Sequence, residues 1–353
     1  MNRTTASNPM SSSSQKILSD CFKRPLHDLR ISVIDRCNFR CNYCMPVEKD
    51  EKKYLFLNQQ EWLSFAEIER LVKIFVSLGV IKIRLTGGEP LLRPHLTDLI
   101  KNLARIPDIE DLALTTNGAL LEELAFPLKE AGLKRLTVSL DTLDENIFKE
   151  MNGGKGSVQK VLQGITAAQR AGFLRIKINT VVQKGINEKT LLDLVRYFKG
   201  SGHILRFIEY MDVGNQNNWR RDSVVPSRAI IEMIGREFPL RALEPNHEGE
   251  VALRYQFADG TGEVGFISSV SEPFCGTCNR ARLTTDGKLY TCLFADSGAD
   301  LRSPLRKGAT DEHIIGMIQD IWCKRKDRYS ELRAKLDHQS SHRRKVEMFQ
   351  VGG

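Results

Sequence analysis

The sequence predicts an α/β protein, with an incomplete (β/α)6 barrel of TIM type followed by a smaller C-terminal domain. Three observations lead to this fold class. Short β-type runs alternate six times with amphipathic helical stretches, the alternation stops near Pro239, and 353 residues with 41% hydrophobic content can bury a substantial core. Six strands fit an incomplete barrel better than a full barrel of eight strands.

The six β-type runs are separated by segments with helical periodicity. In a typical segment, Ser64 is a suitable N-cap for a helix that reaches Leu78. Its apolar residues recur at helical spacing at Ile68, Leu71, Val72 and Phe75. Strand followed by helix, repeated, indicates a parallel sheet covered by helices. The predicted strands span residues 29–34, 82–85, 111–115, 135–139, 175–182 and 204–209.

Polar signatures follow four of these strands. They occupy residues 35–44, 86–90, 115–118 and 139–141, after the first, second, third and fourth runs respectively. In parallel sheets, open or closed into a barrel, ligands bind at the carboxyl ends of the strands. This shared placement predicts a single site, independently of any family.

The pattern changes after Pro239 to shorter β-type pieces at 264–270 and 281–284, with a turn at Asp286 and Gly287 and another short run to Phe294. A smaller second domain is expected there. The predicted organisation is a disordered tail over residues 1–24, the barrel over 25–238, the second domain over 239–330 and a C-terminal tail over 331–353.

The composition of the chain limits the classes of binding partner that we expect. The net charge of +8 suits an anionic partner, but the basic residues are scattered, so we do not expect nucleic acid to be the ligand. No apolar run is long enough to span a bilayer and no secretory signal is recognised, which predicts a cytoplasmic protein without a membrane partner. In that setting, eight cysteines indicate metal or redox chemistry rather than a disulfide framework.

The first cysteine cluster is Cys37, Cys41 and Cys44, three thiols within eight residues on a predicted loop. This spacing can hold three corners of a cubane iron–sulfur cluster and leaves its fourth iron open for a small ligand. Structural zinc is the alternative, but it needs a fourth protein ligand, and only Cys21 and His27 lie nearby.

The second cluster is Cys275 and Cys278, joined after thirteen intervening residues by Cys292, again without an obvious fourth ligand. Another open-iron cluster explains this trio, while a zinc ribbon completed by Cys323 or a distant histidine remains an alternative. Next to it, Arg280 and Arg282 alternate along a predicted strand and therefore point to one face. Two guanidinium groups on one face can bind a polyphosphate or a purine edge.

Residues 37–44, CNFRCNYC, resemble the defining motif of the radical S-adenosylmethionine superfamily, including the aromatic Tyr43 before the third cysteine. The loop TGGEP at 86–90 resembles that superfamily's methionine-binding turn, where glycines allow close backbone approach and a carboxylate accepts from the ligand's ammonium. The resemblance implies that the open iron chelates S-adenosylmethionine. An injected electron then breaks its C–S bond and gives a 5′-deoxyadenosyl radical.

From about Pro25 to Gly353 the chain resembles the MoaA family, the GTP 3′,8-cyclases that begin molybdenum cofactor biosynthesis. Besides the two cysteine trios, the terminal Gly352 and Gly353 are similar to the family's double-glycine ending, which reaches into the active site. The other matching segments are RLTGGEPLLR at 84–93, TTNG at 115–118, SLD at 139–141, RFIEYM at 206–211 and FCGTCNR at 274–280.

The resemblance also assigns expected roles. It implies two [4Fe–4S] clusters, with Cys37, Cys41 and Cys44 as the catalytic trio and Cys275, Cys278 and Cys292 as the second set of metal ligands. The expected S-adenosylmethionine contacts are Tyr43, Gly88, Ser139 and Met211. The expected GTP contacts are Arg30, Arg84, Thr115, Lys177, Arg280, Ala281 and Arg282, with Arg206 as a further candidate for the triphosphate.

The implied reaction is hydrogen abstraction from C3′ of GTP, followed by attack of the sugar radical on C8 of guanine to give (8S)-3′,8-cyclo-7,8-dihydroguanosine 5′-triphosphate. The implied partners are GTP, an electron donor such as flavodoxin or ferredoxin, the downstream cyclic pyranopterin monophosphate synthase and a second copy of the chain in a homodimer.

Two rival functions stay open at this point. One is a peptide-modifying radical enzyme with an auxiliary cluster, and the other is a non-enzymatic zinc or iron–sulfur module that binds nucleic acid. One departure from the family pattern is the lysine-rich segment 47–58, where we expect altered loop packing rather than altered chemistry.

Overall fold

The computed structural model describes residues 17–45, 56–215, 217, 219–336 and 345–352. The divergent segment predicted at 47–58 lies mostly outside these residues. No helix in the described ranges is long and apolar enough to cross a membrane.

A parallel sheet forms the centre of the molecule, with its strands in the order in which they occur along the chain. Each of the six predicted strands is confirmed to within two residues. The first six strands are β1 (Asp28–Ser32), β2 (Lys82–Thr86), β3 (Asp111–Thr116), β4 (Arg135–Ser139), β5 (Lys177–Val182) and β6 (Ile204–Glu209).

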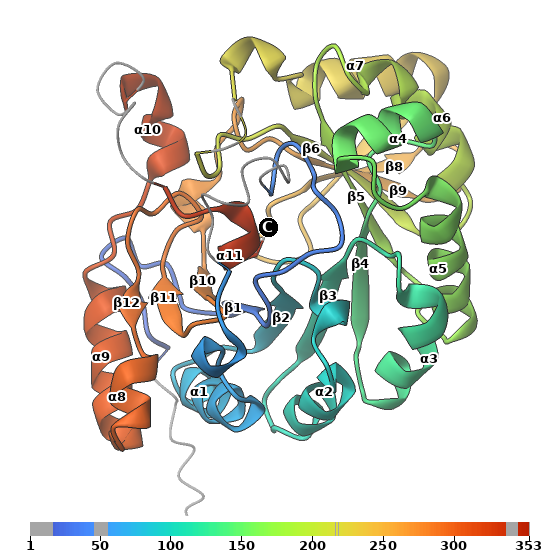
Figure 1. The fold of residues 1–353 in the computed structure, drawn as a ribbon. Coiled ribbons are helices and arrows are strands. Elements are labelled where there is room, and N and C mark those ends of the chain that lie inside the picture. Colours follow the sequence, from blue (N-terminus) through green and yellow to red (C-terminus); the bar gives the residue numbers. More distant parts are fainter. Residues whose placement is uncertain (1–16, 46–55, 216, 218, 337–344, 353) are drawn as a thin grey trace, which may run out of the picture.

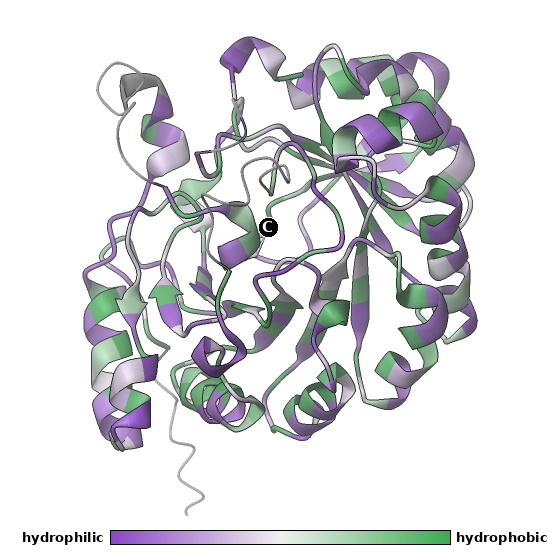
Figure 2. Cartoon of the chain, viewed as in Figure 1, coloured by the Kyte–Doolittle hydropathy of each residue, from purple (hydrophilic) through white to green (hydrophobic). Residues whose placement is uncertain are grey.

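Helices follow these strands and cover the outside of the sheet (Figure 1). They are α1 (Phe65–Ser77), α2 (Leu96–Ala104), α3 (Leu121–Glu130), α4 (Glu145–Asn152), α5 (Val158–Arg170), α6 (Leu191–Phe198) and α7 (Ser227–Glu237). Figure 2 shows hydrophobic and hydrophilic residues alternating around the outer helices, as expected for helices with one buried face. The α/β architecture with a large parallel sheet agrees with the prediction.

Helix α1 shows how local sequence starts an element. The Ser64 side chain accepts a hydrogen bond from the backbone of Glu67, and the Glu67 carboxylate accepts one from the backbone of Ser64. This capping box satisfies two amide groups that the first helical turn leaves without partners. The four apolar residues predicted for the inner face of α1 are all buried.

The register of the parallel strands decides which side chains face inward. Arg30 on β1 is aligned with Arg84 on β2 and with Arg282 on β10 (Arg280–Leu283). Residues in register share a face of a sheet, whereas Leu29 and Ile31 on either side of Arg30 point the other way and are fully buried in the core. The sheet therefore has an apolar outer face under the helices and a cationic inner face.

Strands from beyond residue 238 extend the sheet at both edges. At one edge, β9 (Glu263–Ile267) pairs with β6, followed outward by β8 (Leu253–Phe257) and β7 (Leu240–Leu243). At the other edge, β10 pairs with β1, followed by β11 (Lys288–Tyr290) and β12 (Ala299–Asp300). One twelve-stranded sheet thus crosses the predicted boundary between the two domains.

The ends of the chain are packed against this sheet. Within the predicted disordered tail, residues 1–16 lie outside the described part, but residues 17–24 are ordered, with Asp20 and Arg24 buried. The predicted tail was therefore too long, because two charged residues there have buried partners.

The C-terminal part adds α8 (Arg302–Arg306), α9 (Asp311–Cys323), α10 (Tyr329–Leu336) and α11 (Met348–Val351). Phe349 and Val351 on α11 are fully buried, and α11 packs near β1 (Figure 1).

Candidate active site

A cavity at the carboxyl ends of the parallel strands brings the predicted site together. All six cysteines of the two trios line it, together with residues from the ends of β1 to β6. The two trios are about 230 residues apart in sequence. They line the same cavity because β10 pairs with β1. The prediction of a single site at this end of the sheet agrees with the structure.

The first trio lies on the loop after β1, which backbone hydrogen bonds hold in place. Arg40 and Asn42 donate their backbone amides to the carbonyl oxygens of Asn152 and Met151, each at 2.9 Å. The amide of Cys44 donates to the carbonyl of Cys41 at 2.9 Å, which closes a turn between these two thiols. The loop geometry is therefore fixed from α4 as well as from within.

Burial determines the protonation state of the thiols of the first trio. It raises the pKa of Cys37 to about 12, with the charge of Glu89 adding to the effect, and it also raises the pKa values of Cys41 and Cys44. Without metal these thiols hold their protons at neutral pH, so metal binding must release protons.

The glycine loop after β2 packs tightly against the cysteine loop. The amide of Gly88 donates to the carbonyl of Ile34 at 2.8 Å, and the amide of Glu89 donates to the carbonyl of Arg36 at 2.9 Å. A Cβ atom on Gly88 would collide with the Arg36 carbonyl, and Gly87 has a φ of 145°. The glycines therefore allow the second loop to approach the first one closely.

Glu89 ties this loop to the end of β3. Its buried carboxylate accepts hydrogen bonds from the backbone of Asn117 at 2.7 Å and the Thr116 hydroxyl at 2.7 Å. It also accepts from the amide of Leu91 at 3.0 Å. Burial raises the pKa of Glu89 to about 7, although these bonds favour the charged form.

The four residues predicted to contact S-adenosylmethionine all line this cavity, namely Tyr43, Gly88, Ser139 and Met211. The Tyr43 hydroxyl donates to the Asp141 carboxylate at 2.7 Å, which joins the cysteine loop to the end of β4. Burial raises the pKa of Asp141 to about 6, and its other oxygen accepts from the amide of Val181 at 2.8 Å.

The second trio sits around the short helix η6 (Cys275–Thr277) and the turn after β11. Arg280 and Arg325 each donate to the sulfur of Cys278 at 3.2 Å. Burial opposes the charged thiolate here, but the two guanidinium groups outweigh it and lower the pKa of Cys278 to about 6. Burial raises the pKa of Cys292 to about 12.

Most residues predicted to contact GTP face the same cavity. Arg84 on β2 donates to the hydroxyls of Thr115 on β3 at 3.0 Å and Thr137 on β4 at 3.1 Å. The predicted contacts that line the cavity are Arg30, Arg84, Thr115, Arg206, Arg280 and Arg282.

Two predicted contacts lie elsewhere. The side chain of Ala281 is fully buried in the core, because it alternates with Arg280 and Arg282 along β10 and therefore faces the helices. Lys177 lines an adjoining cavity at the other end of the sheet, and Arg206 lines both cavities. Within the described residues, Ala281 can reach the main cavity only through its backbone.

Several positively charged side chains lie close together on the inner face of the sheet. Burial, followed by the charge of Arg206, lowers the pKa of Lys177 to about 6. Burial and neighbouring arginines lower the pKa of Arg206 to about 9 and that of Arg282 to about 10. Repulsion of this kind is relieved when an anion binds, so the face is suited to a polyphosphate.

The C-terminal turn enters this site. Arg282 donates to the carbonyl oxygens of Val351, at 3.2 Å, and Gly352. Gly352 has a φ of 68°, and a Cβ atom there would collide with the side chain of Thr86. Gly352 therefore lies beside two residues that line the cavity, Thr86 and Arg282, while Gly353 lies outside the described residues.

Sequence reasoning missed two polar residues of the inner face. Lys82 lies on the inner face of β2, between the carboxylates of Asp28 at 3.8 Å and Asp111 at 3.7 Å. Asn179 on β5 lines the main cavity. The signal that could have found them is the period of two along each strand, starting from Arg84 and Lys177.

The donor set of each trio fits an iron–sulfur cluster. Each supplies three thiols, and no histidine lines the cavity in the described part of the chain. Three cysteine ligands leave one iron of a cubane open, whereas a structural zinc site needs four ligands. Among the described residues, no group of three or more His, Cys, Asp or Glu side chains is arranged to hold a single metal ion.

A parallel barrel-type sheet with a CxxxCxxC loop at its carboxyl edge defines the class of radical S-adenosylmethionine enzymes. The family model of the Radical SAM superfamily matches residues 31–198, and that of Molybdenum Cofactor Synthesis C matches residues 203–331. Solved structures agree at the level of fold: Streptococcus suis SuiB bound to S-adenosylmethionine superposes with a TM-score of 0.57 at 15% identity, over 84% of this chain and 68% of that one.

Curated relatives narrow the class to one family. The GTP 3′,8-cyclase of Xanthomonas campestris pv. campestris (strain 8004) is 53% identical over 336 residues, covering 95% of this chain and 97% of that protein. Proteins of the same name from Acidothermus cellulolyticus and Staphylococcus epidermidis are 48% and 44% identical, over 95% and 96% of this chain and 99% and 100% of their own lengths. The chain belongs to the GTP 3′,8-cyclase family.

Proposed function

We propose that this chain is a radical S-adenosylmethionine enzyme that converts GTP to 3′,8-cyclo-7,8-dihydro-GTP, the first step of molybdenum cofactor biosynthesis. Cys37, Cys41 and Cys44 hold one [4Fe–4S] cluster, and Cys275, Cys278 and Cys292 hold the other. The observation that carries this proposal is the single cavity lined by both trios and by inward-facing arginines. Membership of the GTP 3′,8-cyclase family supports the choice of substrate.

The first trio and its surroundings form the S-adenosylmethionine site of this proposal. When bound, the cluster and S-adenosylmethionine supply the 5′-deoxyadenosyl radical that takes hydrogen from C3′ of GTP. Tyr43, Gly88, Ser139 and Met211 surround the ligand, since all four line the cavity beside the cysteine loop. The bonds of Glu89 and Tyr43 hold the loops after β1, β2, β3 and β4 in one arrangement, so these residues orient the ligand rather than react with it.

The arginines of the inner face form the GTP site. Arg30, Arg84 and Arg282 stand side by side on three neighbouring strands, and Arg280 lies against the second trio. Their charges hold the triphosphate, Thr115 adds a hydroxyl, and Arg206 and Lys177 extend the positive face toward the adjoining cavity. The second trio would hold its cluster in the wall of the same cavity, where the cluster would bind the guanine base.

We assign the remaining partners on chemical grounds. Each turnover needs two electrons, one to cleave S-adenosylmethionine and one, with a proton, to reduce the nucleotide radical left by attack on C8, which suits a small electron carrier such as flavodoxin or ferredoxin. The cyclised nucleotide is a substrate for the downstream cyclic pyranopterin monophosphate synthase. GTP and such carriers are available in the cytoplasm, where we place the protein, and a homodimer is our proposed assembly.

The proposal is tested by product formation. The anaerobically reconstituted protein is incubated with S-adenosylmethionine, dithionite and either GTP or ATP, and 5′-deoxyadenosine and cyclised nucleotide are measured by mass spectrometry. We expect both products with GTP only. Formation of 5′-deoxyadenosine that is indifferent to GTP would overturn the substrate.

Metal analysis tests the clusters themselves. We expect about eight irons with matching sulfide per chain, because two cubanes carry four irons each. Replacing the first trio or the second trio by alanine should each remove about half of that iron, and both variants should fail to make the cyclised nucleotide. One or two zinc ions per chain in place of iron would contradict the proposed cofactors.

A further inference from the structure

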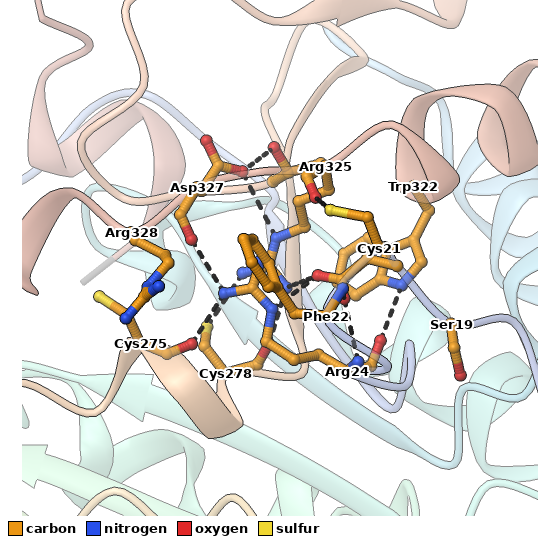
Figure 3. Close-up of polar contacts among 12 residues, drawn as sticks. Ser19, Cys21, Phe22, Arg24, Cys275, Cys278, Trp322, Arg325, Asp327 and Arg328 are labelled. Carbon is orange, nitrogen blue, oxygen red and sulfur yellow. Dashed lines mark hydrogen bonds and ion pairs between the residues drawn. The ribbon is translucent and has the colours of Figure 1, made fainter.

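A group of charged residues, most of them buried, joins the N-terminal segment to the second cysteine trio. It consists of the buried Asp20, Arg24 and Arg325 and the partly exposed Asp327, and we call it the charged clasp. Figure 3 shows Arg24, Arg325 and Asp327 beside the second trio. Nothing in the proposed reaction uses these residues. They nevertheless contact the backbone or sulfur of the second trio at several points.

Asp20 is the centre of the charged clasp. Its side chain is fully shielded from solvent, and its carboxylate accepts from the backbone and the Nε of Arg24 at 2.9 Å and 2.6 Å. The same carboxylate lies 3.4 Å from Nη1 of Arg325. One buried carboxylate thus aligns two buried guanidinium groups, which is the arrangement that keeps buried charges paired.

The two arginines contact different parts of the trio. Arg325 donates to the sulfur of Cys278 at 3.2 Å and to its carbonyl oxygen at 2.7 Å. Arg24 donates to the carbonyl oxygen of Cys275 at 2.7 Å and does not touch a sulfur in the described part of the chain. Both arginines are nearly fully buried, and Arg325 also packs over Trp322 at 4.6 Å.

The charged clasp also reaches the third cysteine. Thr291, the residue before Cys292, donates its hydroxyl to the Asp327 carboxylate at 2.6 Å. That carboxylate lies 3.4 Å from Nε of Arg325, and the backbone carbonyl of Asp327 accepts from Arg24 at 2.9 Å. The two segments that carry the second trio are therefore held to the N-terminal segment by one network of hydrogen bonds and ion pairs.

We propose that Arg325 is a positioning residue that sets the reduction potential of the second cluster through its hydrogen bond to the Cys278 sulfur. This inference rests on the proposed function, because it requires a cluster on the second trio. Hydrogen bonds and positive charge at cluster sulfurs stabilise the reduced cluster, which carries one more negative charge than the oxidised cluster, and so raise its reduction potential. A potential raised in this way makes the second cluster easier to reduce than a cluster without such a donor.

The roles of Asp20 and Arg325 predict effects of opposite sign. Arg325→Gln removes a positive charge beside the sulfur and should lower the potential of the second cluster. Asp20→Asn keeps an oxygen acceptor for the arginines but removes the negative charge that offsets them, so it should raise the potential. A network with only a structural role would move both variants in the same direction or leave the potential unchanged.

The test uses the full chain with Cys37, Cys41 and Cys44 replaced by alanine, so that only the second trio binds iron. After anaerobic reconstitution, the reduced fraction is followed by electron paramagnetic resonance during a redox titration. For Arg325→Gln we expect about a tenfold lower ratio of reduced to oxidised cluster at a fixed potential, which is about 59 mV for one electron. For Asp20→Asn we expect a shift of the opposite sign.

Arg24→Gln is the matched control, because Arg24 shares Asp20 but touches only a carbonyl oxygen. Its shift should be smaller than that of Arg325→Gln. An unchanged potential in Arg325→Gln with full iron content, or an equal shift in Arg24→Gln, would overturn the inference. If Arg325→Gln does not bind iron, a potential in Asp20→Asn that fails to rise overturns it instead. A parent chain that binds no iron on the second trio would refute the proposed function itself.

Discussion

Arg282 on β10 donates a hydrogen bond to the carbonyl oxygen of Val351, at a distance of 3.2 Å. Both residues are almost completely buried, and their hydrogen bond joins β10 to α11. The same arginine is in register with Arg30 and faces the proposed triphosphate site. The C-terminal turn therefore orients a residue to which we assign substrate binding.

Gly352→Val should lower GTP turnover by at least tenfold while both clusters still assemble. A side chain at Gly352 would collide with Thr86, and valine is disfavoured in the left-handed backbone conformation of this residue. The last turn must therefore leave its place beside Arg282. Cyclised nucleotide and iron content are the measurements. Gly308→Val, at another left-handed glycine with no atoms nearby, is the control for backbone strain alone. Equal losses in the two variants would argue against a role of the C-terminal turn.

Binding of GTP at pH 8 should take up a proton at Lys177. Burial and Arg206 lower the pKa of Lys177 to about 6, so it is neutral at pH 8 without ligand, and a neighbouring phosphate raises that pKa. Calorimetry in two buffers with different ionisation heats measures this uptake. Lys177→Met should remove it, whereas Lys189→Met, at an exposed lysine, should leave it unchanged.

The same lysine predicts the direction in which the free energy of unfolding changes with pH. An unfolded lysine keeps its proton up to about pH 10.4, whereas folded Lys177 loses it near pH 6, so the unfolded state binds more protons between these values. Lys177 should therefore make the free energy of unfolding of the ligand-free protein rise with pH in this window. Lys177→Met should reduce that rise when urea unfolding is compared at pH 6.5 and 8.5. An unchanged slope would mean that Lys177 is charged in the folded protein.

Gly88→Ala should impair the first cluster and leave the second intact. The added methyl group collides with the Arg36 carbonyl, just before Cys37, and either loop must shift. Overpacking of this kind costs about 1–3 kcal/mol. We expect iron to fall from about eight toward about four per chain. Gly235→Ala, in an open position on α7, is the control and should lose no iron.

Tyr43→Phe should destabilise the protein by about 1–3 kcal/mol, because it leaves a buried oxygen of Asp141 without its donor. Denaturant unfolding of the metal-free protein measures this change. Tyr255→Phe is the control, since the Tyr255 hydroxyl makes no hydrogen bond among the described residues, and it should change stability by less than about 0.5 kcal/mol. Equal effects of the two substitutions would contradict a structural role of the bond between Tyr43 and Asp141.

Prediction from sequence succeeded where local pattern and spacing carry the information. The alternation of β-type runs and amphipathic helices marked the six parallel strands, and the spacing of Cys37, Cys41 and Cys44 indicated an iron site on the loop after the first of them. It was wrong for residues 17–24, because the burial of Asp20 depends on Arg325, more than 300 residues away. No local signal in the N-terminal segment reports such a partner.

The sequence by itself determined the strands, the two cysteine trios and the arginines beside them, since each depends on residues close together in the chain. Only the tertiary structure decided that the trios share a cavity, that Lys177 faces an adjoining one and that Arg325 contacts Cys278. The pairing of β10 with β1 produces the first of these results. Such pairings join segments far apart in the chain, and they are fixed by the packing of the whole sheet rather than by any local pattern.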